Sequence, residues 1–72
     1  MKTVEQIETL LELAETAGYR IRYEVLGGVG GGICEFGGNK WLFVDLSLGP
    51  MDRLEQVRAA LRTDPSLSTR AA

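Results

Sequence analysis

Histidine is absent from this 72-residue chain, and cysteine occurs only once, at Cys34. A single cysteine cannot form a disulfide within the chain, and one thiolate without histidine cannot supply the usual ligand set of a zinc site. The absence of histidine also removes the usual base of nucleophilic catalysis and the HExxH zinc motif. We therefore expect no metal, no cofactor and no catalytic centre. Cys34 itself is expected to be a small, buried, unreactive hydrophobic residue in a strand.

Clusters of basic residues and long apolar runs are also missing. Eight Lys and Arg residues stand against ten Asp and Glu residues, which gives a net charge of −2. We expect no nucleic-acid partner, because phosphate backbones are bound by concentrated positive surfaces. No apolar run reaches the roughly 20 residues of a membrane span. The start Met1-Lys2-Thr3 leads directly into an acidic amphipathic pattern without an apolar signal segment. The composition thus predicts a cytoplasmic protein without membrane contact.

A chain of this length predicts one domain with a thin margin of stability. Small domains usually gain stability from disulfides, a metal or a partner chain. Because the first two are excluded, association with a second copy, or unusually regular packing, remains.

Two amphipathic helices are predicted, one near each end of the chain. Thr3 and Gln6 have the spacing of a capping box, and Gly18 is typical of a left-handed helix end. Pro50 favours the first position of the second helix, and Asp64-Pro65 indicates its end. Apolar residues recur at three- and four-residue steps in both helices, namely Val4, Ile7, Leu10, Leu11, Ala14 and Ala17, then Met51, Leu54, Val57 and Leu61. A solvent-exposed acidic row is expected on the first helix, formed by Glu5, Glu8, Glu12 and Glu15.

Three strands are predicted between the helices, over residues 19–26, 33–36 and 40–46. Gly38-Asn39 suits the tight turn of a hairpin between the last two, because both residue types tolerate positive φ. The fold class is therefore α+β, with the order α-β-β-β-α and a three-stranded, mainly antiparallel sheet packed with two helices. Residues 1–64 form the domain, and residues 65–72 form a frayed tail.

Alternation sorts the hairpin side chains onto two largely apolar faces. With Gly38 and Asn39 as turn residues, Phe36 faces Trp41 and Cys34 faces Phe43. One face then holds Cys34, Phe36, Trp41, Phe43 and Asp45, and the other holds Ile33, Glu35, Leu42, Val44 and Leu46. Periodicity does not decide which face meets the helices. The aromatic residues are either the core or an exposed surface, and in the second case we expect a homodimer interface at Phe36, Trp41 and Phe43.

The glycine run from Gly27 to Gly32 invites comparison with phosphate-binding loops. Gly28 and Gly30 fit the first two positions of Gly-x-Gly-x-x-Gly, but Ile33 occupies the third. The run also precedes a strand, whereas phosphate loops open onto a helix. A bent connection between strands is favoured. The alternative is a site for a small anionic ligand, formed by Gly28, Gly30 and Gly31 with Arg22.

Paired carboxylates are the remaining candidates for acid–base chemistry. Glu35 and Asp45 fall on opposite faces of the predicted sheet, so they are not expected to meet. Glu35 is expected to pair with Lys40 or Arg22, and Asp45 to cap the turn at Leu46-Ser47. A carboxylate enzyme therefore ranks last among the functions considered.

Residues 26–34, which read Leu-Gly-Gly-Val-Gly-Gly-Gly-Ile-Cys, and Leu-Phe-Val-Asp at 42–45 carry a resemblance. Together they resemble a family of short bacterial proteins of unassigned function, which implies no known activity. The element order is also similar in outline to the zincin-like half of repressor-cleaving metallopeptidases. The helix that carries HExxH there reads Arg-Leu-Glu-Gln-Val-Arg here, at 53–58, and this argues against catalysis. We expect a non-catalytic, self-associating interaction module.

Overall fold

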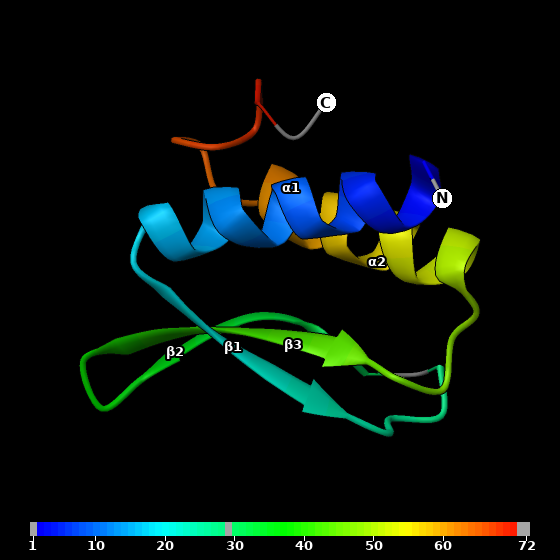
Figure 1. Cartoon of the computed structure of the whole chain (residues 1–72). Helices are drawn as coiled ribbons and strands as arrows, with labels where there is room; N and C mark the ends of the chain where they lie inside the picture. Colours follow the sequence, from blue (N-terminus) through cyan, green and yellow to red (C-terminus); the bar gives the residue numbers. More distant parts are fainter. Residues whose placement is uncertain (1, 29, 71–72) are drawn as a thin grey trace.

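The computed structural model describes residues 2–28 and 30–70. Along the chain lie α1 (Lys2–Thr16), β1 (Tyr19–Glu24), β2 (Gly32–Phe36), β3 (Asn39–Asp45) and α2 (Pro50–Arg62). The predicted α+β class and the order α-β-β-β-α are confirmed. Figure 1 shows two layers, with both helices on the same face of the sheet. Val29 of the glycine run and residues 71–72 of the predicted tail lie outside the described residues.

The sheet is mixed, and β3 is its central strand in the order β1-β3-β2. β2 pairs with β3 in the antiparallel direction, and β1 pairs with β3 in the parallel direction. All three predicted strands are present, although β1 ends at Glu24 and β3 spans Asn39–Asp45. Because β1 and β3 run in parallel, their carboxyl ends meet at one edge of the molecule (Figure 1).

The predicted hairpin turn is wrong by one residue. Gly37 and Gly38 are the turn residues, with φ of +60° and +79°, and Asn39 already belongs to β3. Two consecutive glycines meet the demand for positive φ at both turn positions without steric cost. Cys34 therefore lies opposite Trp41, and Ile33 opposite Leu42. Each partner moves by two residues, which leaves the predicted division into two faces unchanged.

The aliphatic face of the sheet meets the helices. Leu42 and Val44 are completely buried and pack with residues of both helices, among them Leu10, Val57 and Leu61. Full burial of such a side chain stabilises the fold by roughly 1.5–3 kcal/mol. Leu46, which alternation assigned to the same face, is 43% exposed, because β3 ends at Asp45. The aromatic face is consequently left without a covering layer of helices (Figure 1).

The helix ends agree with the sequence except at the start of α1, and α2 ends at Arg62, shortly before Asp64-Pro65 as predicted. The prediction of Thr3 as a cap is wrong, because α1 begins at Lys2 and the Thr3 hydroxyl donates to Sδ of Met51 at 3.6 Å. Gly18, with φ of +95°, follows α1 as predicted, and Pro50 is the first residue of α2. The acidic row on α1 is exposed, as expected.

The packed part of the chain continues beyond residue 64. The Leu67 side chain is 3% exposed and belongs to the core. The backbone N–H of Leu67 donates to the Asp64 carbonyl at 2.9 Å, and the Asp64 carboxylate accepts the N–H and hydroxyl of Ser66. These bonds turn the chain back toward the core directly after α2.

Candidate interaction surface on the open sheet face

Three aromatic rings form a continuous strip on the uncovered face of the sheet. The ring centroids of Phe36 and Trp41 are 6.0 Å apart at an interplanar angle of 15°, and those of Trp41 and Phe43 are 6.4 Å apart at 30°. Phe36 is 60% exposed, and the other two rings are half-buried. The structure thus brings the three predicted interface residues together. We call this row of rings the aromatic strip.

Charged side chains of β1 flank one side of the aromatic strip. The Arg20 guanidinium carbon lies 5.7 Å from the ring centroid of Trp41. Arg22 lies opposite Phe43, and its Nε donates to Oε2 of Glu24 at 3.2 Å. Exposed ion pairs of this kind contribute little to stability. On the other side of the strip, β2 contributes Cys34, which is exposed, so the prediction that this residue is buried is wrong. The reason is that Cys34 lies on the face of the sheet that the helices do not cover.

A shallow groove of about 330 Å³ runs along the strip. Residues of all three strands and of the segment after β1 line this groove: Arg22, Glu24, Leu26, Phe36, Trp41 and Phe43. Aromatic rings with a charged rim offer a surface that can pack against apolar or aromatic side chains.

Asp45 anchors the segment that follows β1. Its carboxylate is completely buried and accepts the backbone N–H groups of Leu26 at 3.0 Å, Gly28 at 2.7 Å and Ser47 at 2.9 Å. The Ser47 hydroxyl also donates to it, at 2.6 Å. The hydroxyl of Ser47, together with these backbone N–H groups, outweighs burial and lowers the pKa of Asp45 to about 2. The predicted role of Asp45 as a turn cap at Ser47 is confirmed, and it extends to the glycine run.

The residues predicted for the alternative anion site lie in different surroundings. The Gly28 N–H is engaged by the Asp45 carboxylate. Gly31, with φ of +97°, lies against α2, because a Cβ there would be 2.8 Å from Nε2 of Gln56. Arg22 lines the groove, and none of the three glycines belongs to the described lining of that groove.

The Gln56 side chain forms hydrogen bonds with the part of β3 that lies beyond Gly32, the first residue of β2. Its Nε2 donates to the Phe43 carbonyl at 3.0 Å, and its Oε1 accepts the Asp45 N–H at 3.2 Å. The side-chain amide thus satisfies one carbonyl and one N–H that a longer β2 would have paired. Sequence reasoning missed this residue, because a polar position on α2 gives no indication of its partner.

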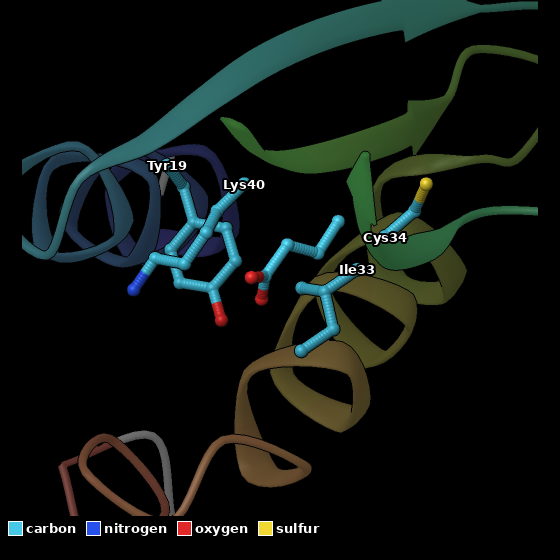
Figure 2. A pocket seen from close by; sticks show the side chains of 5 residues that line it. Tyr19, Ile33, Cys34 and Lys40 are labelled. Carbon is cyan, nitrogen blue, oxygen red and sulfur yellow. The ribbon is translucent and has the colours of Figure 1, made fainter. Parts of the chain in front are cut away.

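A second hollow, of about 190 Å³, is lined by Tyr19, Ile33, Cys34, Glu35 and Lys40. In Figure 2 the Tyr19 and Lys40 side chains lie side by side, while the Cys34 sulfur points away from them. The Lys40 ammonium lies 4.5 Å from the Tyr19 ring centroid. Glu35 is the register partner of Lys40 across the hairpin, but the ion pairs of the described residues do not include the expected pairing of Glu35 with Lys40 or Arg22.

Tyr19, the first residue of β1, links the sheet to the segment that follows α2. Its hydroxyl donates to Oδ2 of Asp64 at 2.7 Å. Burial, with the nearby Asp64 carboxylate, raises the pKa of the Tyr19 phenol to about 12, and the Tyr19 and Ser66 hydroxyls lower the pKa of Asp64. Two Asp-x-Ser sequences, at 45–47 and 64–66, fold into the same kind of turn. That repeated spacing is the one feature of the sequence that could have identified both anchors.

We expect Tyr19 to make the protein sensitive to alkaline pH. A phenol with a raised pKa favours folding while it is protonated, so this stability is complete below pH 10 and is lost as the pH rises from 10 to about 12. Urea unfolding of the wild type and of Tyr19→Phe should therefore show the larger alkaline loss in the wild type. Equal losses in both proteins would contradict the proposed bond to Asp64.

No protein-family model, curated protein or solved structure matches this chain. Among residues 2–28 and 30–70, no group of three or more acidic, Cys or His side chains could hold a metal ion. Neither helix of the described chain is long and apolar enough to cross a membrane.

Proposed function

We propose that this protein is a non-catalytic, cytoplasmic interaction module that self-associates through the open face of its sheet. The observation that carries the proposal is the aromatic strip, which no helix covers (Figure 1). Stacked aromatic rings exposed on one sheet face are typical of an interface. All three rings of the strip lie on strands rather than on loops.

A second copy of the chain is the occupant that the size of the protein favours. A chain of 72 residues buries a small core, and the closing of a second layer against the sheet would add apolar burial without disulfides or metals. Two-fold dimers are the commonest assemblies of soluble proteins. Three strands about 4.8 Å apart and about 20 Å long make a small face, so we expect a reversible dimer in the micromolar range rather than a permanent one.

The proposed lack of catalysis is supported by the chemistry of the described polar groups. Both oxygens of the Asp45 carboxylate, whose pKa is lowered, accept hydrogen bonds from Leu26, Gly28 and Ser47. Cys34 lies on the open face opposite Trp41, and the chain contains no histidine that could act as its base. The Asp45 carboxylate thus holds structure, and Cys34 has no histidine that could activate it for catalysis.

Light scattering on the purified protein tests the proposal. Across a concentration series through the micromolar range, we expect the mass to rise from one chain of 7.9 kDa to two. Because the strip is apolar, raising the salt concentration should leave the dimer intact. A mass of 7.9 kDa at every concentration would contradict self-association.

A further inference from the structure

We infer that the two copies pack with their β3 strands parallel, about a two-fold axis that runs along β3. This inference rests on the proposed function and specifies its geometry. Two sheets that meet face to face through the aromatic strip can be related by an axis along the strands or by an axis across them. The positions of the arginines decide between these two arrangements.

An axis across the strands, centred on Trp41, places β1 of one copy on β1 of the other. Arg20 lies level with Trp41 in the sheet, so it would meet Arg20 of the partner subunit. Two guanidinium groups confined at the same place in an interface repel each other, and such contacts are strongly unfavourable. The described open face provides a single acidic group on β1, Glu24, which already binds Arg22.

An axis along β3 exchanges the two edges of the sheet instead. β1 of each copy then lies over β2 of the other, because β3 separates these two strands. Arg20 and Cys34 are both level with Trp41, so Arg20 faces Cys34 of the partner subunit. The exposed ring of Phe36 lies two residues further along that strand. A guanidinium beside an aromatic ring is favourable, and no like charges meet.

The other arginine finds space in the same arrangement. Arg22 and Gly32 are both register partners of Phe43, so Arg22 lies over Gly32 of the partner subunit. Gly32 carries no side chain, and a Cβ at that position would meet nothing within 4 Å. The centre of the interface is then aromatic, since Trp41 and Phe43 lie on the axis and meet their own copies. Each edge of the sheet thus fits the opposite edge of the second copy.

The two arrangements predict different distances between cysteines placed on the open face. Side chains that face each other across packed sheets have Cα atoms about 10 Å apart, and side chains offset by two strands about 14 Å apart. In the parallel arrangement, the short distance joins position 20 of one copy to position 34 of the other. In the alternative, with the axis across the strands and the two β3 strands antiparallel, the short distance joins position 20 to position 20 and position 34 to position 34.

Cross-linking with a short, rigid bis-maleimide distinguishes them, because the wild type has Cys34 as its only thiol. The second protein is Arg20→Cys combined with Cys34→Ala, which also carries one thiol. We expect covalent heterodimers when the two proteins are mixed, and loss of cross-linking when either protein is treated alone. Intact-mass spectrometry identifies each product. Cross-links in the separate proteins but none in the mixture would overturn the parallel arrangement.

A third protein, Glu12→Cys with Cys34→Ala, controls for random collision, because Glu12 is exposed on α1 away from the sheet. It should give no heterodimer with the wild type. Light scattering on the same samples separates the two proposals. A dimeric mass with cross-links only in the separate proteins contradicts the parallel geometry alone. A monomeric mass with no cross-linked product contradicts both self-association and the geometry.

Discussion

Replacement of both Trp41 and Phe43 by alanine is expected to convert the dimer into a folded monomer. Both rings lie on the open face, so their loss removes the proposed interface and leaves the core between the sheet and helices in place. Aromatic residues at the centre of an interface each cost about 2 kcal/mol or more on truncation. The dissociation constant should therefore rise at least a hundredfold, roughly, by sedimentation or light scattering.

The matched control replaces Tyr23, on the other face of β1, and Val25, which directly follows β1; their side chains are 52% and 76% exposed. This double alanine variant removes two exposed side chains outside the aromatic strip and should remain dimeric. Circular dichroism of both variants should match the wild type. A dimer that survives the loss of Trp41 and Phe43, or one that is lost in the control instead, would place the interface elsewhere on the molecule.

Of the substitutions considered for stability, Asp45→Asn should lower the stability of the fold the most. The asparagine fits the same space, but its NH₂ group replaces an oxygen that now accepts N–H groups. Donors would then face donors at Leu26, Gly28 or Ser47, and a buried N–H without an acceptor is strongly unfavourable. For a domain of this size, we expect the melting temperature to fall by about 10 °C or more.

The Asp45 contribution should depend on pH in a defined way. A carboxylate whose folded pKa is about 2, against 3.8 as its ordinary value, stabilises the fold above pH 3.8. This stability is lost as the pH falls from 3.8 toward 2, so the gap between wild type and Asp45→Asn should narrow there. Asp52→Asn, at an exposed position of α2, is the control and should be close to neutral. A constant gap from pH 6 to pH 2 would contradict the assigned pKa.

Local patterns were sufficient to predict most of the fold. The stripes of α1 and α2, Gly18 and Pro50 depend on neighbouring residues alone, and the structure places them as expected, except that Val4 and Met51 are exposed. The division of the hairpin into two faces was also correct, even though its turn lies one residue earlier. That division survives because any even shift in register returns each side chain to its own face.

Contacts between distant residues were not predictable from the sequence. The choice between two apolar faces depends on where the helices pack, and alternation within one strand contains no such information. The parallel direction of β1, the bridge from Gln56 to Phe43 and the bond from Tyr19 to Asp64 join positions more than ten residues apart. For Asp45, the sequence predicted the adjacent Ser47 but not the amides of the glycine run.

The acidic row on α1 gives the molecule an uneven distribution of charge. Glu5, Glu8, Glu12 and Glu15 are exposed on the helix layer, whereas Arg20 and Arg22 lie on the open face of the sheet. In the proposed dimer, both arginine pairs are enclosed, and the two outer surfaces are helix layers with the same acidic row. Further copies approaching either surface meet charge of their own sign. Growth would therefore stop at two chains, which protects a small protein with an aromatic surface against precipitation.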